Sequence, residues 1–239
     1  MQWTTQWADL ARQLDADMVR VAAGPFSYGL DTTSRQRLAE AAGVHPDMLR
    51  FHSPAETRST DEYWIDRYPV TRIQFARFCE ETGYQREFNG YQVGWHDLGD
   101  TRDIATPAEG LAPVTGVSAA DARAYAAWSG KRLASETEWE KAARGPEGSL
   151  WPWGSQWQGF LSGGNLPLLD PPPVGWADQD VSPAGLRDST LLWEWVGIDG
   201  PLPDSGAVRA RSLPYYFAVS SWLNVQTYTR MPSSRATWD

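Results

Sequence analysis

The chain contains one cysteine, Cys79, and a single thiol can act chemically as a nucleophile or as a soft metal ligand. Both roles need the thiolate, which a nearby cation, histidine or metal must stabilise. Cys79 instead lies with Phe75 and Phe78 on the apolar side of a predicted helix, and no histidine is near it in the sequence. We therefore interpret Cys79 as structural. One cysteine also excludes an internal disulfide and an all-cysteine metal site.

Three histidines, His45, His52 and His96, are the other side chains that could bind a metal or transfer a proton. None has the i,i+4 spacing of a helical zinc pair, and no cysteine lies beside them. His45 and His52 flank Asp47, but a metal site there would need three ligands to converge from loops. A site in which His52 or His96 acts with carboxylates is kept as an alternative.

Aromatic and hydrogen-bonding side chains gather in the C-terminal segment 209–239, with few charges among them. Tyr, Trp and Arg dominate binding hot spots, and aromatic rings supply contact area at a low cost in conformational entropy. Any one of these rings could equally be part of the core. As a group they predict a ligand-binding surface formed by Tyr215, Tyr216, Phe217, Trp222, Asn224, Tyr228 and Arg230.

Short helices and strands must position these groups. Capping-box pairs, each followed by a glycine stop, predict three helices. The pairs are Thr71 with Gln74, Ser118 with Asp121, and Ser135 with Glu138, and the stops are Gly83, Gly130 and Gly145. The runs MVRVAAGPFSYG (18–29) and YWIDRY (63–68) are typical of short strands, and 145–190 is a Gly/Pro-rich loop.

The bulk composition limits the classes of protein. A length of 239 residues with 41% hydrophobic content allows one sizeable core, so we predict a single domain over 1–239. The net charge of −9 argues against nucleic acid or an anionic membrane as partner and is compatible with a basic protein. The N-terminus lacks a signal-peptide pattern, and no 18 apolar residues run together. We expect a soluble, cytoplasmic protein.

Several short motifs occur together in one order along the chain. They are the run GKRLASETEWEKAARGPEGSLWPWG (130–154), the downstream segment LLWEW (191–195), and the earlier segments MVRVAAGPFSYG and YWIDRYPVTRIQFARFCEETGY (63–84). In this arrangement the chain resembles the formylglycine-generating enzyme, or sulfatase-modifying factor, family. The resemblance implies an α+β, C-type-lectin-like domain with short twisted strands, two or three helices and extensive irregular loops. It also implies that the charged groups around Lys131 and Glu138 stabilise the fold through ion pairs.

The resemblance is most informative where the family pattern is broken. The family's oxidases bind copper through two cysteine thiolates in the C-terminal segment, whereas 209–235 contains no cysteine here. Thiolate is the ligand that Cu(I) selects, so we predict that the copper oxidase activity is absent. The related sulfoxide synthases take iron from histidines of a separate helical domain that this chain lacks. The family's closing GFR strand is replaced by ATWD, so either the chain continues or the sheet ends differently.

The family also holds structural calcium, which prefers hard oxygen ligands. Asn165 and Asp170 match one such site, although the loop between them is shortened, and we keep a structural Ca²⁺ ion as an optional cofactor. The second site is weakened because Leu191 and Leu192 replace its GN pair, and Glu194 is interpreted as a buried hydrogen-bond acceptor. Segment 31–56 is an insertion relative to the family, with a helix predicted over 34–42 that ends at Gly43.

Together these features predict a non-catalytic protein that binds a ligand or another protein on a formylglycine-generating-enzyme scaffold. A retroelement-diversified display protein and a toxin-neutralising protein are two such roles. The alternative is a metal-dependent oxidoreductase or tailoring enzyme that uses the same groove with non-cysteine ligands. No cofactor is required by the first hypothesis.

Overall fold

In the computed structural model, the described residues are 5–42, 45–49, 53–85, 104–115, 117–156, 171–190, 194–197, 208–211, 233–234 and 236–238. Six α-helices lie in this part of the chain: α1 (Thr5–Ala16), α2 (Thr32–Ala42), α3 (Arg72–Thr82), α4 (Pro107–Leu111), α5 (Ala119–Trp128) and α6 (Glu136–Arg144). A 3-10 helix, η1, spans Pro46–Leu49. The strands are β1 (Met18–Val21), β2 (Gly24–Tyr28), β3 (Glu56–Thr60), β4 (Tyr63–Asp66), β5 (Arg132–Leu133), β6 (Glu194–Gly197), β7 (Val208–Arg211), β8 (Ser233–Ser234) and β9 (Ala236–Trp238).

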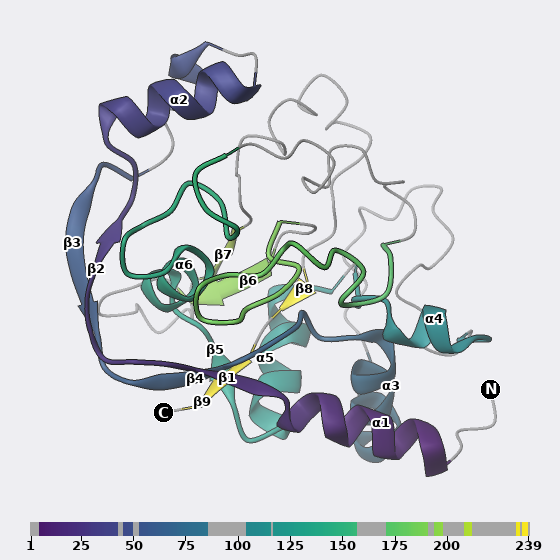
Figure 1. The fold of residues 1–239 in the computed structure, drawn as a ribbon. Helices are drawn as coiled ribbons and strands as arrows, with labels where there is room; N and C mark the ends of the chain where they lie inside the picture. The colour runs from purple at the N-terminus through teal and green to yellow at the C-terminus, as the bar shows by residue number, and fades with distance from the viewer. Residues whose placement is uncertain are drawn as a thin grey trace.

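Three small sheets organise these strands (Figure 1). The first has the order β1-β4-β9-β5, with antiparallel pairing throughout. The second is the two-stranded antiparallel ribbon of β2 and β3, and the third has the order β7-β6-β8. In the third sheet β7 is antiparallel to β6 and β8 is parallel to it. Sequence-distant strands are therefore joined in two of the three sheets.

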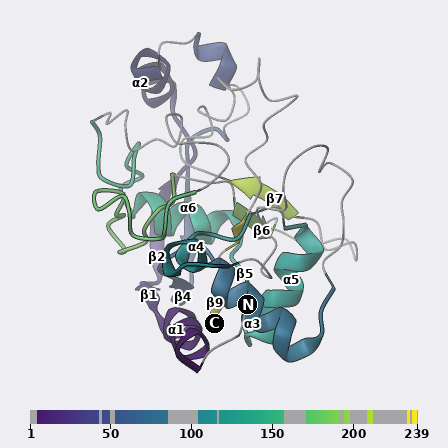
Figure 2. The ribbon, with the colours of Figure 1, turned by 90° about the vertical axis from the view of Figure 1, so that its right-hand side faces the viewer.

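The core lies around α6, between the β2–β3 ribbon and the sheet of β6 (Figures 1 and 2). Trp139 of α6 is 1% exposed and packs with aliphatic side chains of β1 and β4 and with Leu186 and Val196. A second cluster, rich in aromatic rings, joins α3 to α5, and a third joins α1 to α3. Burial of large rings stabilises a protein whose helices are short.

The predicted helix starts are confirmed. The Asp121 side chain accepts from Ser118 N–H at 2.7 Å, and the Glu138 side chain accepts from Ser135 N–H at 2.7 Å. Gln74 accepts from Thr71 N–H at 2.9 Å. These bonds satisfy donors that a helix leaves unpaired at its first turn, which is why local sequence alone marked the three starts.

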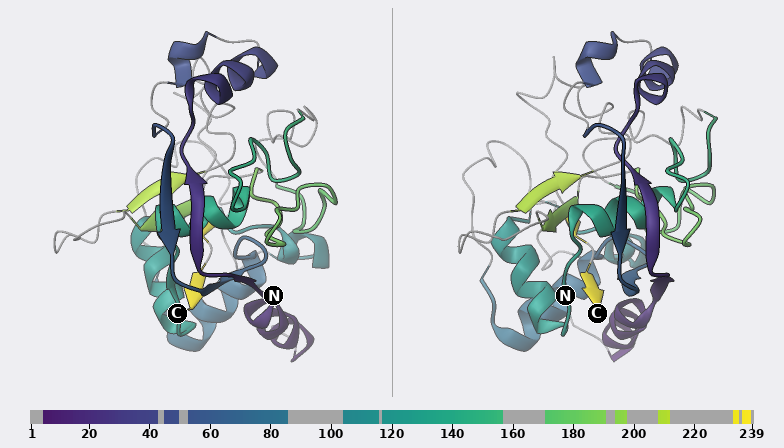
Figure 3. Two further views of the ribbon diagram at one scale, coloured as in Figure 1. Left: turned by 60° about the vertical axis from the view of Figure 1, so that its left-hand side comes forward. Right: turned by 90° about the vertical axis from the view of Figure 1, so that its left-hand side faces the viewer.

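Other features add to the prediction or correct it. The helix predicted in the insertion is present as α2, which lies at the far end of the β2–β3 ribbon from α1 (Figure 3). Helices α1, α2 and α4 bring the number in the described residues to six, above the two or three expected for the fold. The ATWD run that stands in place of the family's GFR contributes to the first sheet. Ala236–Trp238 forms β9, which pairs with both β4 and β5 because backbone pairing does not need the family's side chains.

No helix in the described ranges combines the length and the apolar character needed to cross a membrane.

Candidate binding site

The predicted ligand-binding residues lie outside the described residues, as do the two predicted calcium ligands. They are Tyr215, Tyr216, Phe217, Trp222, Asn224, Tyr228 and Arg230 for the ligand, and Asn165 and Asp170 for calcium. His52 and His96 are also outside the described ranges. The structure does describe the strands on either side of the predicted ligand-binding segment.

Strand β6 anchors both ends of this segment. Glu194 of β6 has Arg211 of β7 as its Cα partner on one side and Ser233 of β8 on the other. Arg211 and Ser233, the described residues on either side of 212–232, therefore lie at the same level of strand β6. Neighbouring strands are about 4.8 Å apart, so the two attachment points are separated by about 10 Å.

Strand β6 is itself held firmly in the core. Glu194 is fully buried and Val196 is 0% exposed. The Trp195 indole N–H donates to Val117 O at 2.9 Å, and Gly197 N–H donates to Ala134 O at 2.8 Å. The strand is thus tied to the residue before α5 and to the residue after β5.

Cys79 lies where the sequence predicted, on α3. It is partly buried against the cluster that contains Phe75, Phe78 and Tyr125, with Trp128 packed on the same cluster. Phe78 and Tyr125 meet edge to face, with ring centroids 5.9 Å apart. The surroundings of the thiol are therefore largely aromatic, which is the setting expected for a cysteine with a structural role.

His45 lies in an exposed position beside Asp47, with Nδ1 3.3 Å from the Asp47 carboxylate. The His45 side chain is 73% exposed. Among the described residues, no group of three His, Cys, Asp or Glu side chains is arranged to hold a metal ion. The described part of the insertion thus brings together one histidine and one carboxylate.

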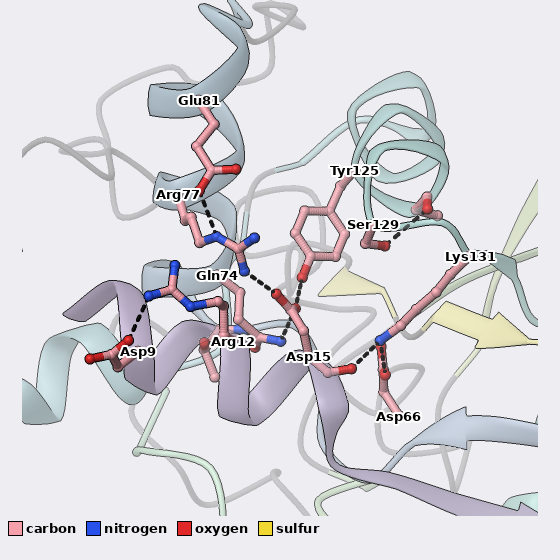
Figure 4. Close-up of polar contacts among 12 residues, drawn as sticks. Asp9, Arg12, Asp15, Asp66, Gln74, Arg77, Glu81, Tyr125, Ser129 and Lys131 are labelled. Carbon is pink, nitrogen blue, oxygen red and sulfur yellow. Dashed lines mark hydrogen bonds and ion pairs between the residues drawn. The ribbon is translucent and has the colours of Figure 1, made fainter. Parts of the chain in front are cut away.

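A partly buried polar network connects α1, α3 and α5 (Figure 4). Asp15, at the end of α1, accepts hydrogen bonds from Gln74 Nε2 at 2.7 Å, from Arg77 Nη1 at 2.8 Å and from the Tyr125 hydroxyl. Burial, followed by the charge of Asp15, raises the pKa of Tyr125 well above its ordinary value. The network satisfies the Asp15 carboxylate and fixes the three helices relative to one another.

The charged residues around α6 are structural, as predicted from the motif. Lys131 pairs with Asp66 at 2.6 Å, and the side chains of both are less than 5% exposed. Arg132 forms a two-pronged pair with Glu138, at 2.7 and 2.8 Å. Lys131 reaches back to β4, however, so its pair joins the first sheet rather than the two helices.

Lys141 of α6 holds the β2–β3 ribbon through hydrogen bonds to neutral oxygens. Its ammonium donates to Ala22 O at 2.7 Å and to Gly24 O and Thr60 Oγ1, both at 2.8 Å. The Phe26 ring lies 5.8 Å from the same nitrogen. Desolvation lowers the pKa of Lys141 because burial disfavours its charged form.

A pocket of about 700 Å³ lies between the ribbon and α6, and sequence reasoning missed it. Residues 58–63 form one wall, and Arg132, Ser135, Thr137 and Glu138 form the other. Within this wall the buried Tyr63 hydroxyl donates to Glu138 O, and burial raises the pKa of Tyr63. The only signal in the sequence was a run of hydroxyl and charged residues, ETRSTDE (56–62), which is unremarkable for a surface.

Comparison with known proteins gives one family match. The model of the "Sulfatase-modifying factor enzyme 1-like domain" matches residues 5–187. The chain is similar to the "Inactive C-alpha-formylglycine-generating enzyme 2" of Bos taurus, with 31% identity over 236 residues, covering 80% of this chain and 73% of the relative.

Other relatives differ in what their names state. The hercynine oxygenase of Mycolicibacterium smegmatis is 30% identical over 200 residues, covering 74% of this chain and 44% of that protein. The formylglycine-generating enzyme of Thermomonospora curvata is 35% identical over 180 residues, covering 61% of this chain and 54% of that enzyme. The chain therefore spans about half the length of these two relatives.

A solved structure supports the fold alone. The structure of PvdO from Pseudomonas aeruginosa superposes with a TM-score of 0.60 at 18% identity, covering 93% of this chain and 94% of PvdO.

Proposed function

The chain belongs to the sulfatase-modifying factor enzyme 1-like domain family, and we propose that it is a non-catalytic member that binds a protein or a small ligand. It has the α+β fold of formylglycine-generating enzymes and lacks their catalytic cysteine pair. The named relatives include both an inactive protein and enzymes, so the family alone does not decide between them.

The single cysteine is the observation that carries the proposal. A two-thiolate copper site needs two cysteines in the C-terminal segment, and the one cysteine of this chain is Cys79. Cys79 lies on α3, packed against Phe75 and Phe78. The residues present do not fit Cu(I) in the family's manner, because hydroxyl groups do not replace thiolate sulfur for this soft ion.

The anchoring of residues 212–232 supports a binding role for that segment. The two described residues that flank this segment, Arg211 and Ser233, both pair with Glu194 of β6. Fixed ends reduce the conformational entropy that a binding segment loses when it meets its ligand. Aromatic and arginine side chains are the residue types found at binding hot spots. We propose that the ligand contacts Tyr215, Tyr216, Phe217, Trp222, Asn224, Tyr228 and Arg230.

The partner follows from charge. A net charge of −9 favours a basic protein and disfavours nucleic acid and anionic membranes. The proposed function requires no cofactor, and we propose that the protein acts in the cytoplasm. A structural Ca²⁺ ion bound by Asn165 and Asp170 is an optional addition. An increase in the unfolding temperature when calcium is added would detect it.

The resemblance to hercynine oxygenase favours one competing function. In that case the protein is a metal-dependent oxidoreductase or tailoring enzyme that uses His52 or His96 with carboxylates. It predicts one tightly bound iron or copper ion per chain, and loss of that ion when either histidine is replaced by alanine.

The two functions are separated by two measurements on the full chain. Metal analysis of protein purified without chelators should find no stoichiometric iron or copper, and a cysteine-containing sulfatase peptide should not be converted to formylglycine. Formation of formylglycine would overturn the proposal.

Binding to the partner should be measured with alanine at Tyr215, Tyr216 and Trp222, each of which we expect to weaken binding by about 2 kcal/mol. Trp176→Ala is the matched control, because Trp176 is 52% exposed and lies outside the segment. Aromatic variants that keep full affinity and fold normally would place the ligand elsewhere.

A further inference from the structure

The outer edge of β3 presents backbone groups that point away from its partner. The register pairs Ser27 of β2 with Thr57 of β3. Ser27 N–H donates not to β3 but outward, to Pro146 O at 3.0 Å. In an antiparallel pair, two facing residues either both bond to each other or both point away. Thr57 therefore directs its own N–H and C=O away from β2.

Pro25 supports the same register independently. It faces Ser59 in the ribbon and has no N–H to donate. A proline fits a position whose N–H would point outward, so Pro25 and Ser59 also form a non-bonded pair. The N–H and C=O groups of Thr57 and Ser59 thus form one row on the outer edge of β3.

This edge has no partner strand in the part of the chain that the structure describes. The ribbon contains β2 and β3 only, and no described backbone group bonds to Thr57 or Ser59 from outside it. The outer edge of β2, by contrast, is covered at Ser27 by Pro146. Figure 3 shows the two strands of the ribbon side by side, crossing α6.

The pocket of about 700 Å³ adjoins this edge, because Arg58, Ser59 and Thr60 form part of its wall. On the opposite wall, the Thr137 hydroxyl accepts from Arg58 Nη1 at 2.8 Å. A strand added to β3 would lie in this space with side chains alternating between the pocket and solvent. The pocket gives the added strand a second surface to contact besides the backbone edge.

The charges of the pocket are compensated except at Asp61. Arg132 pairs with Glu138 at 2.7 Å, and Glu62 pairs with Arg20 at 2.5 Å. Asp61 is exposed and has no ion-pair partner among the described residues. A cation on an incoming strand would therefore meet one carboxylate that no arginine already neutralises.

We propose that the β3 edge is a docking site for an extended segment of another protein, which adds as a strand and places a Lys or Arg side chain against Asp61. A second copy of this chain would bring another net charge of −9 to the same edge, so charge favours a basic partner over self-association. The site lies apart from residues 212–232 and does not depend on the function proposed for them.

Selection from a displayed library of random nine-residue peptides against the full chain tests this site. We expect binders enriched in Lys or Arg whose affinity falls about tenfold or more in Ser59→Pro, which removes the outward N–H. Ser59→Ala is the matched control, because it removes only the hydroxyl and should bind as the wild type does. Asp61→Asn should weaken binding by about threefold to fivefold, and less so at high salt.

N-methylation of the selected peptide tests the geometry without altering the protein. Methyl groups on alternate backbone nitrogens should abolish binding, while those on the intervening nitrogens should not, because only every second N–H of a strand faces its neighbour.

Three results would overturn the proposal. They are the absence of any enriched peptide, equal affinity of the two Ser59 variants for the selected peptide, or an effect of N-methylation that does not alternate along the peptide. A dimer in light scattering that Ser59→Pro dissociates would show that a second copy is the occupant. Alanine at Tyr215 or Trp222 should leave peptide binding unchanged, which separates this test from that of the proposed function.

Discussion

Two buried lysines hold two regions of this molecule in different ways. Lys131 joins the helical region to the first sheet through an ion pair with Asp66 at 2.6 Å, and it also donates to Asp15 O at 2.7 Å. Lys141 joins the β2–β3 ribbon to α6 through three neutral oxygens at 2.7 to 2.8 Å. Both lysines are buried, but among the described residues only Lys131 has a carboxylate within ion-pair distance.

This difference between an ion pair and bonds to neutral oxygens predicts which substitutions destabilise each region. An ion pair hidden from solvent is worth little in net terms, but loss of one partner leaves the other charge buried and unpaired. A lysine bonded to neutral oxygens has no charged partner, so its removal leaves no buried charge unpaired. It leaves instead oxygen acceptors without a hydrogen bond. We therefore expect removal of the Asp66 carboxylate to destabilise the contact between the helical region and the first sheet. We expect removal of Lys141 to destabilise the ribbon.

The largest effect is expected for Asp66→Ala. The variant leaves the Lys131 ammonium buried beside a cavity, so the free energy of unfolding should fall by about 3–5 kcal/mol, measured by urea denaturation. The double variant Asp66→Leu with Lys131→Met removes both charges and should recover a substantial part of the loss. If the double variant is no more stable than the single one, packing rather than charge explains the effect.

Lys141→Met should have a smaller but still clear effect. Methionine keeps the length of the stem and leaves Ala22 O and Gly24 O without their donor, which we expect to cost about 2–3 kcal/mol. Hydrogen exchange should show faster opening of the β2–β3 ribbon than of α5. A variant as stable as the wild type would mean that desolvation of the ammonium cancels its three hydrogen bonds.

The two regions should also respond oppositely to alkali. The pKa of Lys141 is lowered from 10.5, so just below pH 10.5 the unfolded chain binds a proton that the folded chain has lost. Stability from this group therefore rises with pH in that window. Comparing the pH dependence of unfolding in the wild type and Lys141→Met isolates the contribution, and identical slopes would contradict it.

In the helical region, the raised pKa of Tyr125 has the reverse consequence. Above pH 10 the unfolded chain releases the phenolic proton while the folded chain keeps it, so stability falls as pH rises. Tyr125→Phe should reduce this fall, although the raised pKa of Tyr63 leaves part of it in place. A fall that is unchanged in Tyr125→Phe would remove Tyr125 as its source.

The smallest effect is expected for Thr60→Val, which removes one of the three acceptors of Lys141 and nearly conserves volume. We expect a loss of about 1 kcal/mol in the free energy of unfolding, with Thr60→Ser close to the wild type. A loss as large as that of Lys141→Met would show that Thr60 Oγ1 is the dominant acceptor.

Features that depend on residues close together in the sequence were predictable, whereas features that depend on pairing with a distant strand were not. Ser118 with Asp121 and Ser135 with Glu138 close their hydrogen bonds within four residues, so the sequence marks those helix starts. Strand β9 is three residues long, and only its two neighbours make it a strand. Its existence depends on β4 and β5, which lie far away in the sequence.

The candidate sites divide in the same way. The sequence predicted the helix on which Cys79 packs with Phe75 and Phe78, because the spacing of residue types carries that information. The ligand-binding surface predicted within 209–239 lies outside the described residues. The sequence did not predict the edge at Thr57 and Ser59, since the direction of each N–H depends on the bond that Ser27 makes to Pro146.

The sequence by itself determined the family, the helix starts and the loss of the cysteine pair, because these depend on residue identity and on contacts between near neighbours. Only the tertiary structure decided which carboxylate pairs with Lys131, which oxygens accept hydrogen bonds from Lys141, and which edge of the ribbon has no partner strand among the described residues. The contacts of the two lysines join residues far apart in the sequence; Asp66 and Lys131, for example, are separated by 65 positions. Their partners are selected by the packing of the whole chain rather than by any local pattern.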